Sequence, residues 1–235
     1  MPVALITGAS RGFGRALADD LVRDGWDLVV DARDAAALGL AAEELVASAP
    51  TARVAAIAGD ISDAGHRDEL VAAARALGGL DLLVNNASVL GPSPQPTLDT
   101  YPLDVLETVF RVNVIAPLGL VQQALPLLIE RSGTIVDITS DAAVEGYEGW
   151  GGYGSSKAAL EQLSNVLAAE QANSGVRVYW FDPGDMRTQM HQEAFPGEDI
   201  SDRPLPETVV PSLRALLRDS RPSGRYRASE FEAVS

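Results

Sequence analysis

The stretch Thr7-Gly8-Ala9-Ser10-Arg11-Gly12-Phe13-Gly14 decides the fold, because it joins an apolar strand predicted over residues 3–7 to a helix predicted over residues 12–24. Its three glycines allow a tight turn and a close approach of the backbone to a ligand. The unpaired N–H groups and the positive dipole at a helix N-terminus bind phosphate groups. The spacing differs from the Gly-x-Gly-x-x-Gly of the common dinucleotide fingerprint. The stretch predicts a turn that holds a dinucleotide pyrophosphate, with a plain tight turn as the alternative.

Short apolar runs alternate with helical stretches along the rest of the chain. Further strands are predicted over residues 27–31, 53–58, 81–84, 134–138, 176–181 and near 224–228, and further helices over 35–48, 63–77, about 102–131, 153–172 and 206–219. The strands are continuously apolar, as in parallel sheets that are covered on both faces. This pattern predicts a single Rossmann-type α/β domain over residues 1–235, a doubly wound parallel sheet of about seven strands with helices on both faces. Residues 88–101 and 184–206 break the pattern and are expected to be loops, the second a substrate loop.

Composition narrows the possible partners and cofactors. The 235 residues carry a formal net charge of −15 and include no cysteine. The acidity argues against a nucleic-acid or anionic-membrane partner. The lack of cysteine excludes disulfides and thiolate metal sites, and no His/Asp/Glu cluster has metal-ligand spacing, so no metal is predicted. With no apolar run near the roughly 20 residues of a membrane span and no basic leader before the first strand, a cytoplasmic protein is expected.

The end of the second predicted strand bears on the choice of dinucleotide. NAD-binding folds usually place an acidic residue there to bind the ribose 2′-hydroxyl. Ala32 occupies that place here, Arg33 follows it, and Arg11 lies in the glycine turn. Two guanidinium groups suit a 2′-phosphate, so the sequence favours NADP(H). The alternative is that both arginines face solvent and that Asp31 binds the ribose of NAD(H).

Tyr153 and Lys157 lie four residues apart at the start of a predicted helix, so they share one of its faces. An ordinary phenol has a pKa near 10, and a nearby ammonium lowers that pKa by stabilising the phenolate. A general acid–base works best when its pKa is near the working pH. The pair therefore suits proton transfer, although a Tyr-x-x-x-Lys match alone is common on protein surfaces.

Four further motifs accompany the glycine turn and the tyrosine–lysine pair. They are Asp60-Ile61 after the third strand, Asn85-Asn86-Ala87-Ser88 after the fourth, Asn113 in the long helix with Ser140 thirteen residues before Tyr153, and Pro183-Gly184 followed by Thr188. With them the chain resembles the short-chain dehydrogenase/reductase family, in its compact single-domain branch, over nearly its whole length. Two positions depart from the family pattern: Ser88 replaces a glycine, and Asp141-Ala142-Ala143 follows Ser140 in place of further hydroxyls.

The resemblance implies an oxidoreductase that acts on CH–OH or C=O groups with the catalytic tetrad Asn113, Ser140, Tyr153 and Lys157. Tyr153 would exchange a proton with the substrate oxygen, Ser140 would hydrogen-bond that oxygen, and the nicotinamide would carry the hydride. Lys157 would tune Tyr153 and bind the ribose. Asn113 would anchor a water that links Lys157 to solvent, or would bond the backbone at a helix kink.

The turn and the resemblance together give an expected set of ligand-binding residues. Those expected to bind the cofactor are Thr7, Gly8, Ser10, Arg11, Gly12, Phe13, Gly14, Arg33, Asp60, Ile61, Asn86, Ala87, Tyr153, Lys157, Pro183, Gly184, Met186 and Thr188. Those expected to bind the substrate are Ser88, Val144, Tyr147, Trp150, Met190 and His191, with ordinary packing as the alternative for the apolar ones. His66 is expected to face solvent.

Three hypotheses about function follow. The first is an NADPH-dependent reductase of a ketone, aldehyde or imine, and the second is an NAD-dependent alcohol dehydrogenase. The third is a non-catalytic NADP-binding sensor or scaffold, against which the complete tetrad argues. A hydrolase is disfavoured because no Gly-x-Ser-x-Gly elbow is present. Relatives often pair through the helices that hold Asn113 and Tyr153, so a homodimer or homotetramer is expected by analogy.

Overall fold

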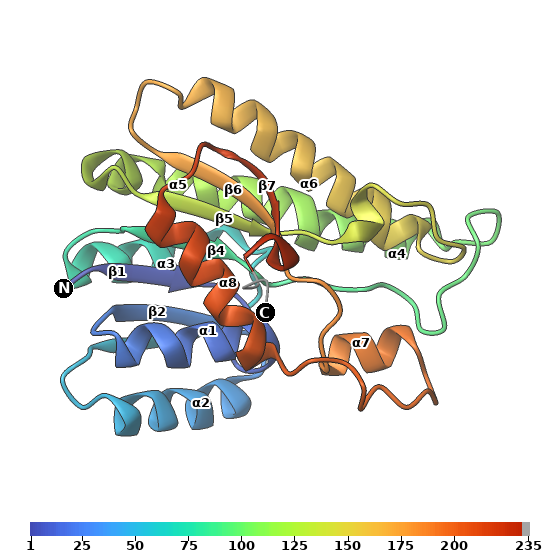
Figure 1. The fold of residues 1–235 in the computed structure, drawn as a ribbon, viewed down its shortest axis with the longest axis horizontal. Coiled ribbons are helices and arrows are strands. Elements are labelled where there is room, and N and C mark those ends of the chain that lie inside the picture. The colour runs from blue at the N-terminus through green and yellow to red at the C-terminus, as the bar shows by residue number, and fades with distance from the viewer. Residues whose placement is uncertain (232–235) are drawn as a thin grey trace.

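A computed structural model describes residues 1–231 and contains one seven-stranded sheet in the order β3-β2-β1-β4-β5-β6-β7, with every neighbouring pair parallel (Figure 1). The strands are β1 (Val3–Ile6), β2 (Asp27–Ala32), β3 (Val54–Ala58), β4 (Leu82–Asn85), β5 (Thr134–Ile138), β6 (Arg177–Asp182) and β7 (Gly224–Arg227). The predicted Rossmann-type class is confirmed. The strand order reverses between β1 and β4, and open α/β sheets bind ligands at the carboxyl ends of the strands at such a point.

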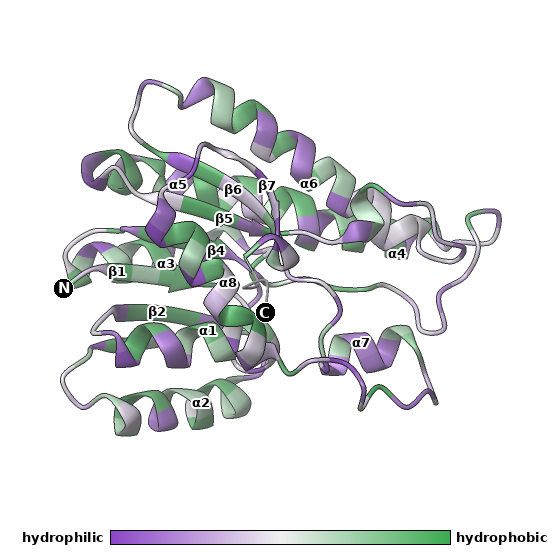
Figure 2. Cartoon of the chain, viewed as in Figure 1, coloured by the Kyte–Doolittle hydropathy of each residue, from purple (hydrophilic) through white to green (hydrophobic). Residues whose placement is uncertain are grey.

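Helices cover both faces of the sheet (Figure 1). One face carries α1 (Gly12–Arg23), α2 (Ala35–Ser48) and α8 (Pro206–Asp219), and the other carries α3 (Ala64–Leu77), α5 (Ala116–Arg131) and α6 (Gly151–Glu170). Each face has its own cluster of buried apolar side chains, and β1 and β2 are buried along their whole length. Figure 2 shows the hydrophobic strands between helices that alternate apolar and polar faces. The continuous apolar runs in the sequence follow from this double coverage.

Two segments differ from the sequence-based expectation. The long helix is one run of α4 (Leu103–Phe110), a π-helical turn (Arg111–Ile115) and α5, and the second expected loop contains a short helix, α7 (Gln189–Ala194). The hydroxyl of Thr188 accepts a hydrogen bond from the His191 N–H and so caps α7. Other element ends lie within about two residues of their predicted positions, the ordinary uncertainty of helix and strand ends.

The expectation that no apolar run is long enough for a membrane span is wrong for Leu103–Arg131, which passes that test by length and composition alone. Half of its most apolar stretch is buried inside the protein, where the run packs against α3 and α6. Core helices of globular domains have the same composition when they face other helices and a sheet. Packing in the core therefore accounts for the buried half of this apolar run.

Candidate active site

The glycine turn between β1 and α1 has the geometry of a phosphate cradle. Gly8 and Gly12 have φ angles of 66° and 59°, in the left-handed region that glycine adopts without strain. Helix α1 begins after Arg11 with no side-chain cap and with no acidic residue in its first turn. Its first N–H groups are therefore available to an anionic ligand. These features fit a bound dinucleotide.

The residues after β4 are locked to this turn. The Thr7 hydroxyl oxygen accepts hydrogen bonds from the N–H groups of Asn86 (3.0 Å) and Ala87 (2.9 Å). The Asn86 side-chain amide donates to the carbonyls of Thr7 (2.8 Å) and Gly8 (3.1 Å). A Cβ atom at Gly14 would lie 2.4 Å from that amide nitrogen, so the packing requires a glycine there. The two sides of the topological switch point thus form one rigid unit.

Asp31 supports the glycine turn with its buried carboxylate. Its carboxylate is buried and accepts a hydrogen bond from the Gly8 N–H at 2.7 Å, while its other oxygen lies 3.1 Å from His66 Nε2. The expectation that His66 faces solvent is wrong, since only 6% of it is exposed. The hydrogen bond to Asp31 raises the pKa of His66, against the effect of burial. Both carboxylate oxygens of Asp31 therefore have partners inside the protein.

The two arginines expected to clamp a 2′-phosphate have different surroundings. Arg33 is exposed just after β2. Its charge helps to lower the pKa of Asp60, mainly the effect of the hydrogen bond from the Ser62 N–H. Arg11 instead donates to the side-chain oxygen of Gln189 in α7. Arg11 and Arg33 thus have different partners in this structure, and their joint binding of a 2′-phosphate stays a prediction.

The tyrosine and lysine lie together on the first turns of α6, as predicted. Tyr153 and Lys157 are 8% and 2% exposed, and Lys157 Nζ lies 5.5 Å from the centre of the phenol ring. The ammonium donates to the carbonyl of Ile138, the last residue of β5, at 2.8 Å. Ser140 follows in the turn from β5 to α6, where its neighbour Ala142 packs against Tyr153. The structure thus brings Ser140, Tyr153 and Lys157 to the carboxyl end of β5.

Burial controls the protonation of this pair. It raises the pKa of Tyr153 well above its usual range, and the charges of Asp182 and Asp141 add to the effect, while the neighbouring Ser88 hydroxyl lowers it. Burial also lowers the pKa of Lys157 to about 8, against the charges of Asp137 and Glu161. The lowered pKa expected for Tyr153 is not found in the protein alone, where burial is the largest influence and raises the pKa. The raised pKa of Tyr153 favours its protonated form.

Asn113 lies in the π-helical turn and fixes two segments of the site. Its side chain is buried and exchanges two hydrogen bonds of 2.9 Å with the backbone of Val89. The amide also donates to the Ser156 hydroxyl at 3.0 Å, which in turn donates to the carbonyl of Tyr153. Both amide hydrogens are thus used within the protein, which matches the helix-kink alternative. Ser156 was not among the predicted site residues. Its position between Tyr153 and Lys157 is the one feature of the sequence that could have indicated its role.

A partly buried ion network next to Ser140 was not predicted from the sequence. Arg225 on β7 donates to the Ser140 carbonyl (3.1 Å), to Asp182 (3.1 Å) and to Glu161 (2.9 Å). Thr139 donates to the same Glu161 oxygen at 2.7 Å. Arg225 thereby holds the main chain of the predicted catalytic serine. Arg225 lies far along the chain from the other site residues, so no local pattern in the sequence connects it with them.

The side chains expected to line the substrate site divide into two groups. Trp150 and Met190 pack with Leu90, Ala142 and Tyr153, and the Trp150 ring lies edge-on to Tyr153 with 5.8 Å between centres. Val144 and Tyr147 are exposed in the turn before α6. The first group forms an apolar wall around the phenol, and the second lies at its rim.

The remaining expected residues come from the segments after β4 and β6. The hydroxyl of Ser88 is buried and has no hydrogen-bond partner among residues 1–231. His191 is buried on α7 with its ring 4.9 Å from that of Phe195, which lies 5.8 Å from Trp150. Met186 packs against the core cluster beneath α1, apart from the apolar wall. The segment with α7 therefore contributes Met190, His191 and Phe195 to this region.

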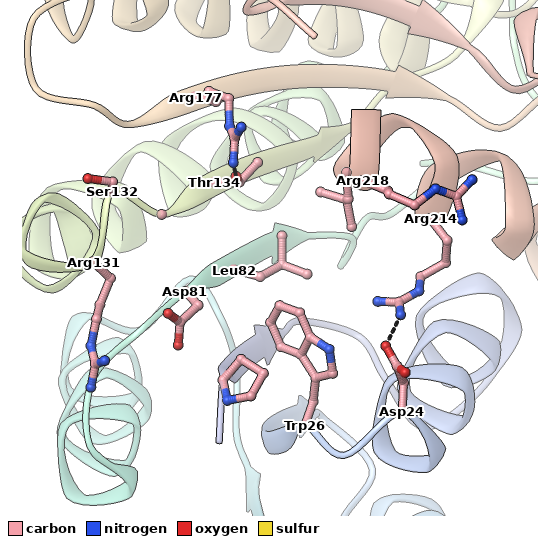
Figure 3. A pocket seen from close by; sticks show the side chains of 13 residues that line it. Asp24, Trp26, Asp81, Leu82, Arg131, Ser132, Thr134, Arg177, Arg214 and Arg218 are labelled. Carbon is pink, nitrogen blue, oxygen red and sulfur yellow. Dashed lines mark hydrogen bonds and ion pairs between the residues drawn. The ribbon is translucent and has the colours of Figure 1, made fainter. Parts of the chain in front are cut away.

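A cavity of about 530 Å³ lies at the opposite end of the sheet (Figure 3). It is lined by residues at the amino ends of β4, β5 and β6, among them Leu82, Thr134 and Arg177. Figure 3 shows Trp26 at its floor and Arg214 turned toward Asp24, with which it forms an ion pair. Ligands of open α/β sheets bind at the carboxyl ends, so this cavity is separate from the candidate active site.

Comparisons with known proteins agree with this geometry. The family model described as short chain dehydrogenase matches residues 2–199. Sepiapterin reductase from Mus musculus is 37% identical over 82% of this chain and 77% of its own, and serine 3-dehydrogenase from Rhizobium radiobacter is 36% identical over 79% and 72%. A short chain dehydrogenase from Shigella flexneri 2a, solved in complex with NADP, superposes with a TM-score of 0.89 at 29% identity, covering 97% of each chain.

Proposed function

The chain belongs to the short chain dehydrogenase family, and on that premise we propose that it is an NADPH-dependent reductase of a ketone, aldehyde or imine. The observation that carries the proposal is the placement of the buried Tyr153 phenol beside Lys157, near the carboxyl end of β5 that Ser140 follows. A protonated general acid is the form that carbonyl reduction requires. A cytoplasmic location and a homo-oligomeric state are further parts of the proposal.

The reaction converts a carbonyl compound, NADPH and a proton into an alcohol and NADP⁺. NADPH, when bound, supplies the hydride. Tyr153 donates its phenolic proton to the substrate oxygen as that oxygen gains negative charge. Lys157 stabilises the phenolate that remains, and Ser140 hydrogen-bonds the same oxygen. The wall formed by Trp150 and its neighbours excludes water, which strengthens these charge interactions.

Several features of the chain support NADP(H) over NAD(H). At the β2 end Ala32 occupies the place of the usual acidic residue, and Asp31 is engaged with Gly8 and His66. Arg33 is exposed beside it, with the donor geometry that suits a phosphate. The Shigella flexneri neighbour is complexed with NADP. Within the proposal, the glycine turn holds the pyrophosphate, Arg33 the 2′-phosphate, and Pro183, Gly184 and Thr188 the nicotinamide side.

The experiment that tests this function is NADPH consumption against a panel of ketones, aldehydes and cyclic imines. We expect turnover with at least one class and a fall of about 100-fold or more in Tyr153→Phe, the range of one lost general acid. The variant keeps the ring that packs against Trp150 and should bind NADPH as the wild type does. If the protein binds NADPH yet turns over no member of the panel, a non-catalytic binding protein becomes the better description.

A further inference from the structure

A carboxylate lies directly against the predicted catalytic serine. Asp141 is half-buried, and one of its oxygens accepts the Ser140 hydroxyl at 2.9 Å and the Ala142 N–H at 2.8 Å. The other oxygen accepts the Tyr147 hydroxyl at 2.9 Å. Among residues 1–231, no arginine, lysine or histidine forms an ion pair with Asp141. The protein thus keeps an uncompensated negative charge at the point where the substrate oxygen is expected to bind.

The field of this charge reaches the groups around it. The hydrogen bond to Asp141 raises the pKa of Tyr147, and the charges of Glu145 and Asp185 add to that effect. The charge of Asp141 also contributes to the raised pKa of Tyr153, although burial is the larger cause. A negative potential therefore extends over both the rim and the reacting phenol. A carboxylate on a substrate would be repelled there, and a cation would be attracted.

A chain of aromatic rings begins at this carboxylate with Tyr147, whose hydroxyl donates to Asp141. The Tyr147 ring lies edge-on to Trp150 with 6.4 Å between centres, and Trp150 contacts Tyr153 and Phe195, each at 5.8 Å. A carboxylate at the end of an aromatic cluster combines a charge-assisted hydrogen-bond acceptor with nearby rings that attract cations. This is the chemistry that recognises a protonated amine.

We propose that Asp141 binds a protonated amino group next to the reacting carbon, so that the substrate class is amino ketones and the corresponding amino alcohols. The inference rests on the proposed function and names the substrate class of that site. In the structure the Ser140 hydroxyl donates a hydrogen bond to Asp141. A substrate ammonium that donates to Asp141 replaces this bond and frees Ser140 to donate to the carbonyl oxygen. A neutral substrate leaves Asp141 in place as a competing acceptor of the hydrogen bond from Ser140.

The alternative role of Asp141 is structural. Its bonds to Ala142 and Tyr147 fasten the turn Asp141–Ala143 to the loop before α6. A fastening role predicts that replacing the carboxylate affects all substrates alike. Amine recognition predicts a loss confined to amino substrates, so the ratio between substrates distinguishes the two roles.

The test uses three alcohols that share one reacting carbon and differ in charge: 2-amino-1-phenylethanol, 1-phenylethane-1,2-diol and mandelate, each oxidised with NADP⁺. In the wild type we expect kcat/KM for the amino alcohol to exceed that for the diol by about 10- to 100-fold, the range of a hydrogen bond to a charged group. Mandelate should be the poorest of the three. In Asp141→Asn the ratio of amino alcohol to diol should fall to near one.

Glu148→Gln is the matched control, because it removes an exposed carboxylate one residue beyond Tyr147. It should keep the wild-type ratio. A measurement on the wild type alone covers the case in which Asp141→Asn does not fold: 2-phenylethylammonium should inhibit diol oxidation more strongly than 3-phenylpropanoate. Equal inhibition by both ions, or an unchanged ratio in Asp141→Asn, overturns the inference. Reduction of neutral ketones and amino ketones at equal kcat/KM would contradict this inference alone and leave the proposed function intact.

Discussion

The ammonium of Lys157 is the group whose titration should limit the reaction at high pH. Its pKa is lowered to about 8, chiefly by burial, so it loses its charge as the pH rises through that value. The Tyr153 phenolate formed during reduction is then no longer stabilised. We expect kcat/KM for carbonyl reduction to be level below about pH 7 and to fall through about pH 8. A pH profile with a ketone identified by the panel measures this.

Lys157→Arg is the control for that assignment. A guanidinium stays charged throughout this pH range. The kcat/KM that the variant retains should therefore show no fall near pH 8. A fall that persists at the same pH in Lys157→Arg would assign it to another group.

The buried pair of His66 and Asp31 should make stability depend on pH. The pKa of His66 is raised, with the hydrogen bond to Asp31 as the largest cause. A raised pKa in the folded state adds stability that is fully present below the ordinary pKa of about 6.5 and is lost as the pH rises through the folded value. His66→Gln should therefore lower the free energy of unfolding by about 1–3 kcal/mol at about pH 5.5, and by less at about pH 9.

Urea unfolding of both proteins at the two pH values measures this difference. The pH-dependent part should vanish when Asp31→Asn is present in both backgrounds, because the charged acceptor is then missing. An equal loss at both pH values would show that His66 contributes by packing against Gly59 alone, where its ring fills the space of an absent Cβ.

At the scale of elements, the contact between α1 and the segment after β4 decides whether the glycine turn forms. A Cβ at Gly14 would overlap the Asn86 amide, which must then leave the carbonyls of Thr7 and Gly8. Gly14→Ala should cost about 1–3 kcal/mol of stability and weaken NADPH binding. Thermal unfolding and a fluorescence titration with NADPH measure the two effects.

Gly39→Ala is the matched substitution in α2. A Cβ at Gly39 meets no atom within 4 Å, and alanine is the better helix former. This variant should be more stable than the wild type by about 0.5–1 kcal/mol, with unchanged NADPH binding. Similar losses in both variants would contradict the role given to the contact between Gly14 and Asn86.

The sequence predicted those parts of the fold and site that depend on local pattern. The glycine turn, the apolar strands and the four-residue spacing of Tyr153 and Lys157 are short-range signals, and the structure places them as expected. The π-helical turn left no such signal, because apolar residues continue through it at helical spacing. Helix α7 has only six residues and too few apolar positions to show a period.

Contacts between residues that lie far apart in the sequence could not be predicted from local patterns. His66 was expected to face solvent because nothing near it in the sequence indicates Asp31 as its partner. Arg225 reaches Ser140 only because β7 pairs with β6. The clamp of Arg11 and Arg33 stays a prediction, and the contact of Arg11 with Gln189, almost the whole chain away, left no signal in the sequence. Such partners are set by tertiary packing and not by spacing.

For the whole molecule, exposed apolar side chains support association between copies of the chain. Ile115, on the helical run that holds Asn113, is 58% exposed, and Val166 on α6 is 43% exposed. We expect light scattering to give the mass of two or four chains. Combining Ile115→Glu with Val166→Glu should shift the mass to a single chain, because charge cannot be buried there without a partner.

Leu40→Glu serves as the comparison, since Leu40 is 64% exposed on α2, across the sheet. It should leave the mass unchanged. A wild-type mass of one chain, over a range of protein concentrations, would contradict the expected association.

Helix α7 touches both halves of the candidate site. Arg11 of the glycine turn bonds to Gln189 at its start, and Met190 and Ala194 pack into the wall around Tyr153. Anyone who redesigns this helix to admit a bulkier substrate will therefore also disturb the nucleotide end. Selectivity for the substrate and retention of the coenzyme will have to be optimised together.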